Sequence, residues 1–449
     1  MLEELSAQVR SGDINPVDLV NESLRRIEAS APLNAVVAVY ADEARAHAAS
    51  HPRTGALAGL PFLVKDMARV KGHVTTSGSS LYAKGSPDEV DDSVVARLRQ
   101  AGAIIIGRTN SPEFGATAYT TNNVFGATRN PWNTEKSPGG SSGGSAASLA
   151  AGLVPIATTS DGGGSVRGPA SATGLVGYKP SMGAIGRNIL PRWIDFSTQG
   201  TSGHSVADVV YEAAITHGPA NGDFLGLPEK SISLVPSMPR RVLACRTFRT
   251  DVDPDIEANY ESMIDALVAS GITVERVASP SDNDTIWNWF IMSTAQLTQS
   301  LRHEEHRWNE LTDYVQAQLK FGSTVTIDQY IAAQRKRHEI SLRFDDLLGT
   351  DAVLLTPTSN ARSWSPEGPL PTRAGNTDDP MITLNTPDAN FTGHPATSVP
   401  MGLDDNAVPC GIHITGPRFE DQLTLGLAAH IERIRPWPLT APGYKPFGL

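Results

Sequence analysis

The stretches "SPGGSSGGSAAS" (residues 137–148) and "TSDGGGSVRGPAS" (residues 159–171) lie close together and raise the question of which serine does chemistry. A serine hydroxyl is a poor nucleophile until a base removes its proton, and the oxyanion that it forms needs hydrogen-bond donors. Successive N–H groups of the glycines 162–164 can form a concave nest beside Ser165. Ser165 is therefore the candidate nucleophile.

The segments around these clusters predict the fold class. "GSAASLAAG" (144–152) is typical of a helix of small residues, and "LVPIATTSD" (153–161) predicts a strand after it. Upstream, "LAGLPFLVKD" (57–66) and "GAIIIGRTN" (102–110) are apolar runs of strand length, which is typical of strands buried on both faces. Helical spacing in "DDSVVARLRQAG" (91–102) links the two as a strand–helix–strand unit. The chain is predicted to be an α/β protein.

Later segments extend this organisation. Residues 205–345 carry longer helical patterns, and 359–390 is rich in Pro, Asp, Asn and Thr, which predicts a long surface loop. Strands resume with "DAVLLTPT" (351–358), "ATSVPMG" (396–402) and "CGIHITGP" (410–417). Because strand-like segments occur at both ends of the chain, we expect one interleaved domain over 1–449.

Composition excludes several classes of function. The 449 residues carry a net charge of -11, which argues against a nucleic-acid partner. Only Cys245 and Cys410 occur, so there is no disulfide framework. The N-terminus lacks the pattern of a signal peptide, and no apolar run approaches the ~18 residues of a membrane span. We expect a cytoplasmic protein without a membrane partner.

The base for the serine cannot be a neighbouring histidine, because none lies between the two clusters. Lysine is the other base known for serine, provided that it is neutral, and desolvation favours the neutral form. Lys65 ends the apolar run "GLPFLV" and is suited to this role. The S-x-x-K pattern of β-lactamases is excluded, because no lysine here has a serine three positions before it.

Two alternatives stay open at this point. Gly140–Gly144 matches G-x-S-x-G, which would make Ser142 the nucleophile of an α/β-hydrolase with a histidine downstream. The candidate histidines are His394, His413 and His430. However, the bulky apolar strand expected before such a turn is missing. Alternatively, both clusters are glycine-rich ligand loops of a noncatalytic binding protein, although no "GK[ST]" phosphate-loop motif is present.

Three blocks resemble the amidase signature family of serine hydrolases. These are "VKD" (64–66), "GGSSGGSAA" (139–147) and "SDGGGSVRGPASATGLVGYKPS" (160–181), in the order and spacing of that family. Weaker elements such as "FTGHPATSVPMG" extend the resemblance over most of the chain. It implies one large mixed β-sheet between helical layers, with no metal or organic cofactor.

The resemblance also implies residue roles. Ser165 is similar to the nucleophile, Ser141 to a bridging serine behind a cis Gly140–Ser141 bond, and Lys65 to the base. The backbone amides of an oxyanion hole would be those of Gly162, Gly163, Gly164 and Ser165. Structural support would come from Asp161, Arg167 and Ser142.

The activity that this implies is hydrolysis of a carboxylic amide, or a related C–N acyl bond, through an acyl-Ser165 intermediate. An alternative is the glutamine-hydrolysing subunit of a tRNA-dependent amidotransferase. The segment "DFSTQGTSGHSVAD" (195–208) departs from the family pattern at Ser197, Thr201 and His204, which favours a stand-alone enzyme. A homodimer is the family-based expectation.

The substrate stays open. "IWNWF" (286–290) could line an aromatic pocket, or it could simply pack in the core. Other candidate pocket segments are "GATAYTTNNV" (115–124), residues 187–199 and the loop after Thr358. Gly115 and Ala116 are small, which leaves room for a sizeable acyl group.

Overall fold

Most strands of the protein join in one large sheet. The computed structural model describes residues 1–228, 232–371 and 383–448. The large sheet consists of β5 (Thr159–Asp161), β6 (Val176–Lys179), β7 (Thr198–Gly203), β8 (Arg241–Ala244), β9 (Val274–Arg276), β10 (Ala352–Pro357), β11 (Ala396–Leu403) and β12 (Pro409–Thr415). Its order is β5-β7-β6-β11-β12-β10-β8-β9, with the β10/β8 and β8/β9 pairs parallel and the other pairs antiparallel. The predicted large mixed sheet is confirmed.

A second, smaller sheet accompanies it, which the sequence did not separate from the first. Its strands are β1 (Val36–Val39), β2 (Pro61–Lys65), β3 (Ile104–Thr109) and β4 (Ile156–Ala157), in the order β1-β3-β2-β4. β2 and β3 are parallel and are joined through the helix α4 (Ser93–Gln100), so the predicted strand–helix–strand unit is confirmed. Every residue of β2 and β3 is buried, as their continuous apolar runs predict.

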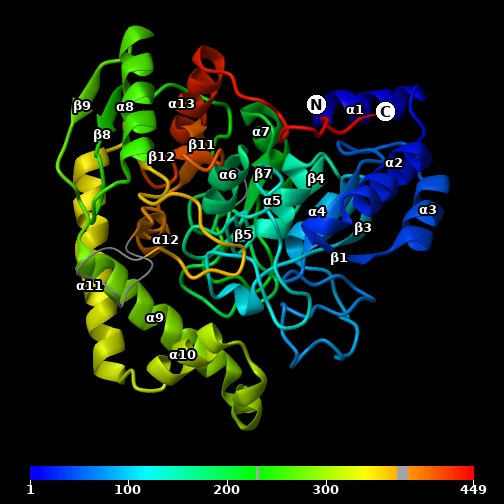
Figure 1. The fold of residues 1–449 in the computed structure, drawn as a ribbon, viewed down its shortest axis with the longest axis horizontal. Helices are drawn as coiled ribbons and strands as arrows, with labels where there is room; N and C mark the ends of the chain where they lie inside the picture. Colours follow the sequence, from blue (N-terminus) through cyan, green and yellow to red (C-terminus); the bar gives the residue numbers. More distant parts are fainter. Residues whose placement is uncertain (229–231, 372–382, 449) are drawn as a thin grey trace.

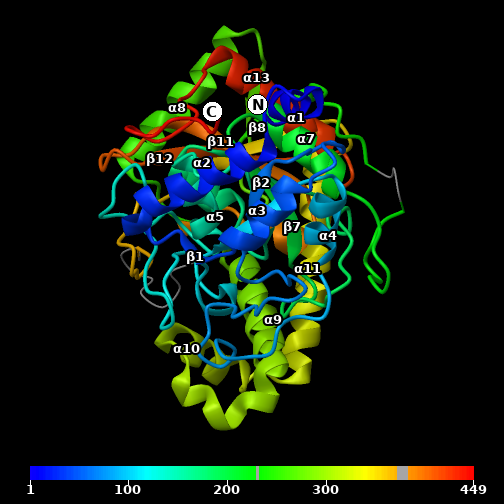
Figure 2. The same cartoon turned by 90° about the vertical axis from the view of Figure 1, so that its right-hand side faces the viewer.

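Helices surround both sheets (Figure 1). Besides α4, the α-helices are α1 (Leu2–Ser11), α2 (Pro16–Ala29), α3 (Ala41–Ala49), α5 (Gly143–Ala150), α6 (Arg167–Thr173), α7 (Val206–Thr216), α8 (Pro254–Ala269), α9 (Asn283–Leu301), α10 (Asp313–Gly322), α11 (Ile327–Leu348), α12 (Pro387–Thr392) and α13 (Asp421–Ile434). The 3₁₀ helices are η1 (Ala31–Leu33), η2 (Glu113–Gly115) and η3 (Arg302–Glu310). Figures 1 and 2 show α9, α10 and α11 together at one end of the molecule. No helix among the described ranges is long and apolar enough to cross a membrane.

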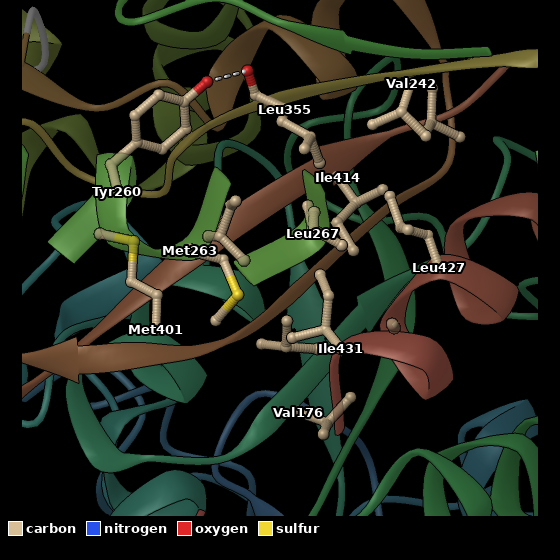
Figure 3. Packing of buried hydrophobic residues seen from close by; sticks show 14 of the residues in the cluster. Val176, Val242, Tyr260, Met263, Leu267, Leu355, Met401, Ile414, Leu427 and Ile431 are labelled. Atoms are coloured by element: carbon tan, nitrogen blue, oxygen red, sulfur yellow. Dashed lines mark hydrogen bonds between the residues drawn. The ribbon is translucent and has the colours of Figure 1, made fainter. Parts of the chain in front are cut away.

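The two faces of the large sheet have different roles. Ile412 and Ile414 of β12 lie in the apolar cluster that α8 and α13 build on one face, where Figure 3 shows Met263 and Ile431 among the packed side chains. Alternate residues of a strand point to opposite faces. His413 of β12 accordingly contacts Arg167 of α6 on the other face. This second face therefore carries α6 and the glycine loop that precedes it.

Three sequence-based boundaries were wrong in part. The run 153–161 forms two strands rather than one, because β4 joins the small sheet and β5 the large one, with Thr158 between them. The range 205–345, predicted to be helical, also contains β8 and β9. The helix α12 occupies the end of the loop predicted at 359–390, of which residues 372–382 lie outside the described part. The single-domain organisation stays a prediction.

Candidate active site

Lys65 lies at the end of β2, where it is almost completely buried. Hydrogen bonds join its Nζ to three serine hydroxyls: Ser141 at 2.8 Å, Ser142 at 2.9 Å and Ser160 at 3.0 Å. Each serine comes from one of the two clusters on either side of α5. The structure thus brings together residues separated by up to ninety-five positions in the chain.

The Lys65 ammonium is destabilised by its surroundings. Burial lowers the pKa of Lys65 to about 7, and the charge of Asp161 acts in the opposite direction. Removing a cation from water favours its neutral form. Near neutral pH a large fraction of Lys65 is therefore an uncharged amine, which can accept a proton.

Ser141 and Ser165 lie on loops that meet beside Lys65. The Gly140–Ser141 peptide bond is cis, as the resemblance implies. The N–H of Ser142 donates to the carbonyl oxygen of Ser165 at 3.2 Å, which ties the first serine cluster to the second. Lys65, Ser141 and Ser165 line one cavity, so the three predicted catalytic residues share one solvent space.

The glycines before Ser165 are sterically required. A Cβ on Gly162 would lie 2.5 Å from the ring of Trp193, and one on Gly163 would lie 2.6 Å from the ring of Trp289. Gly164 has a φ of 127°, which side chains rarely adopt, and a Cβ there would collide with Thr386. Positions 162–164 therefore have no space for a side chain at the edge of the cavity that Ser165 lines.

Asp161 and Arg167 hold this glycine loop in place. The Asp161 carboxylate accepts the N–H of Gly164 at 2.7 Å and that of Val166 at 3.0 Å. It also accepts two hydrogen bonds from the Arg167 guanidinium, at 3.0 and 2.9 Å. Burial acts to raise the pKa of Asp161, but the charge and hydrogen bonds of Arg167, the charge of Lys179 and the Val166 N–H together outweigh it and hold this pKa far below its usual range. The pair therefore stays charged and braces the loop from inside the protein.

One predicted oxyanion-hole donor is committed elsewhere. Because the N–H of Gly164 donates to Asp161, it serves the loop rather than an oxyanion in the cavity. The predicted set of oxyanion-hole donors stays a prediction, and this hydrogen bond argues against Gly164 as one of them. The amides of Gly162, Gly163 and Ser165 are the ones that the geometry leaves for that role.

The three histidines named for the Ser142 alternative lie elsewhere. His413 contacts the Arg167 guanidinium at 2.8 Å, and burial lowers its pKa well below the usual range. His394 pairs with Asp345 at 3.2 Å, and His430 bonds to Ser270. Two cavities border Ser165, and none of these three histidines is among the described residues that line them. Ser142 instead supports Lys65 and bonds to the Ser160 carbonyl.

Two cavities meet at Ser165. One, of about 720 Å³, contains Lys65 and Ser141; we call it the polar cavity because more than half of its lining residues are polar or charged, although apolar atoms supply most of its surface. The other, of about 290 Å³, is largely apolar. Its lining includes Tyr119, Trp193, Trp287, Trp289, Phe290, Tyr314, Trp364 and Leu370. The segment 286–290 therefore does contribute to a pocket, and Gly115 and Ala116 lie at its wall.

Sequence reasoning missed Ser160, the third hydroxyl on Lys65. It immediately precedes the "DGGGS" motif, and on β5 it alternates with Asp161, so the two side chains point to opposite faces. This period of two was the available signal. The Asp161 side chain braces the glycine loop, whereas the Ser160 hydroxyl accepts a hydrogen bond from Lys65.

Comparison with known proteins agrees with this geometry. The amidase family profile matches residues 18–425. The chain is 34% identical to a subunit of the glutamyl-tRNA(Gln) amidotransferase of Synechococcus sp. (strain CC9605), over 95% of this chain and 94% of that protein. The crystal structure of a bacterial aryl acylamidase of the amidase signature family superposes with a TM-score of 0.88 at 28% identity, covering 96% of this chain and 95% of that one. For 6-aminohexanoate cyclic dimer hydrolase in complex with substrate, the TM-score is 0.88 at 26% identity, over 98% of both chains.

The chain belongs to the amidase family. It is an enzyme that hydrolyses a carboxylic amide, and its substrate is a small-molecule amide.

Proposed function

We propose that this enzyme cleaves its amide through an acyl-Ser165 intermediate, with Ser141 relaying protons to and from neutral Lys65. The observation that carries the proposal is the hydrogen bond between Lys65 Nζ and Ser141 Oγ in the cavity that also contains Ser165. A buried lysine with a pKa near 7 is matched to proton transfer at neutral pH. No histidine is needed for this arrangement.

Acylation then proceeds in two steps. Ser165 Oγ attacks the amide carbon, its proton passes to Ser141 Oγ, and the Ser141 proton passes to Lys65 Nζ. When the tetrahedral intermediate breaks down, the Lys65 ammonium returns a proton to Ser141, which protonates the amide nitrogen as the C–N bond breaks. Water repeats the sequence against the acyl-enzyme and releases the carboxylate.

The oxyanion of each tetrahedral intermediate needs donors that are already in position. We assign this role to the backbone amides of Gly162, Gly163 and Ser165. The close contacts of Gly162 and Gly163 with tryptophan rings support the assignment, because they restrain the loop without a side chain in the way. Asp161 and Arg167 contribute by fixing the loop, not by touching substrate.

The two cavities suggest where each half of the amide substrate binds. Ser141 must reach the leaving nitrogen, and both Ser141 and Lys65 line the larger, polar cavity. We therefore place the amine half in the polar cavity and the acyl half in the aromatic one. An apolar acyl group buried there contributes about 25 cal/mol per Å² of surface removed from water.

A glutaminase role like that of the amidotransferase relative fits this division less well. Its acyl half would be the γ-glutamyl group, which carries both an ammonium and a carboxylate. The aromatic cavity offers one charged lining residue among those described, Asp404, which is occupied by the N–H groups of Ser363 and Val408. A buried carboxylate without a partner there would be costly.

Labelling with a fluorophosphonate, followed by intact mass and peptide mapping, tests the proposal. We expect one adduct on Ser165, none in Ser165→Ala, and strongly slowed labelling in Ser141→Ala. An adduct on Ser142 would instead support the alternative nucleophile. Turnover of glutamine, with copurifying subunits, would favour the amidotransferase role. The cytoplasmic location and the homodimer stay predictions.

A further inference from the structure

The polar cavity contains several charged side chains, and most of them are neutralised. Its charged lining residues, apart from Lys65, are Arg69, Asp88, Asp92, Arg187 and Arg192, with His303 at the edge. Arg69 pairs with Asp88 at 3.6 Å, and Arg187 pairs with Asp223 at 3.1 Å. Asp92 lies at the start of α4, and burial raises its pKa to about 6.

Arg192 differs from these residues. Within the described ranges no carboxylate lies at ion-pair distance from its guanidinium. The central carbon of the guanidinium instead lies over two aromatic rings, 4.7 Å from the centre of Phe114 and 5.6 Å from that of Tyr82, and the two ring planes are inclined at 72° to each other. Arg192 is partly buried, which lowers its pKa, yet an arginine keeps its charge in proteins.

Withdrawing such a cation from water costs free energy unless an anion pairs with it. Desolvation of a charged group is unfavourable, and cation–π contacts offset it only in part. The two rings restrict where the guanidinium can lie, and its fork of N–H donors matches the geometry of a planar carboxylate. Arg192 therefore presents to the cavity a cation that no described carboxylate pairs with and whose donors match a carboxylate.

Arg192 and Ser141 line the same cavity. Phe114 is followed by Gly115, where a Cβ would lie 3.1 Å from the Ser141 hydroxyl oxygen. Trp193, next to Arg192, lines both cavities. Arg192 thus faces the cavity that contains Ser141, which is the side of the leaving nitrogen.

We infer that Arg192 binds a carboxylate on the amine half of the substrate, so that the substrate class is an apolar acyl group in amide linkage to an amino acid. The inference rests on the proposed function, which places the amine half in the polar cavity. Cleavage adds one water across the C–N bond and yields an apolar carboxylic acid and a free amino acid. Arg192 determines specificity and takes no part in proton transfer.

Calorimetric titration tests this with ligands that differ in one group. The probes are phenylacetylglycine and its neutral counterpart N-propyl-phenylacetamide, titrated into Ser165→Ala so that neither is consumed. We expect the carboxylate ligand to bind more tightly, and Arg192→Gln in the same background to weaken it on the order of tenfold to a hundredfold. The affinity for the neutral ligand should change less than about threefold, because this ligand makes no ionic contact.

Arg69→Gln is the matched control, since Arg69 lines the same cavity but is already paired with Asp88. It should retain the preference for the carboxylate ligand, and Arg192→Lys should restore part of it. Equal binding of the two ligands, no binding of either, or a preference that survives Arg192→Gln would overturn the inference. Because this readout does not use Ser165 chemistry, failure of the nucleophile assignment would show separately, as absent fluorophosphonate labelling.

Discussion

The pH dependence of Ser165 labelling gives the sharpest test of the Lys65 assignment. If the reactive form is the neutral amine with a pKa of about 7, roughly one lysine in eleven is neutral at pH 6 and roughly ten in eleven at pH 8. The rate of labelling by a fluorophosphonate should therefore rise about tenfold across this range and then level off. Lys65→Ala removes the base and should lower the rate by about 10² to 10⁴.

The assay is the second-order rate constant of labelling, measured by intact mass between pH 5.5 and 9. Lys179→Met is the control, because burial also lowers the pKa of Lys179 to about 7, yet its Nζ donates to the Pro180 carbonyl and lies outside the described lining of both cavities. That variant should keep the wild-type profile. A flat wild-type profile, or a midpoint lost with Lys179 rather than Lys65, would refute the reasoning.

The same group makes a prediction for stability. The pKa of Lys65 is lower in the folded protein than its value of 10.5 in the unfolded chain. Between about pH 7 and 10.5 the unfolded state therefore binds more protons, and the free energy of unfolding rises as the pH increases. Lys65→Met should flatten this rise, which urea titrations at pH 7 and 9 would measure. An unchanged slope would contradict the lowered pKa.

Two further changes probe the glycine loop. Gly163→Ala places a Cβ 2.6 Å from the Trp289 ring and should slow labelling and cost about 1 to 3 kcal/mol, whereas Gly168→Ala, whose Cβ meets nothing closer than 4.0 Å, should be tolerated. Equal effects of the two would argue against the steric explanation. Asp161→Asn leaves the Arg167 charge buried without its partner, so urea unfolding should show a loss of about 3 to 5 kcal/mol. A loss below about 1 kcal/mol would show that the loop is not braced by this pair.

The sequence by itself determined the local features of this protein. The continuous apolar runs at β2 and β3 predicted buried strands, and the glycines and serines around residues 141 and 165 predicted loops in the backbone. The apolar run before Lys65 predicted a buried lysine with a lowered pKa. These inferences succeed because burial, turn formation and backbone freedom depend mainly on neighbouring residues.

Only the tertiary structure decided what depends on residues distant in the chain. An apolar run such as 153–161 has the same pattern whether it serves one sheet or two, so its division into β4 and β5 was hidden. Whether the Gly164 N–H donates to Asp161 or to an oxyanion depends on where the Asp161 carboxylate points. Whether Arg192 has an ion-pair partner depends on which carboxylates the fold brings near it. Hydrogen bonds and ion pairs act over a few ångströms in space, and sequence spacing does not measure that distance.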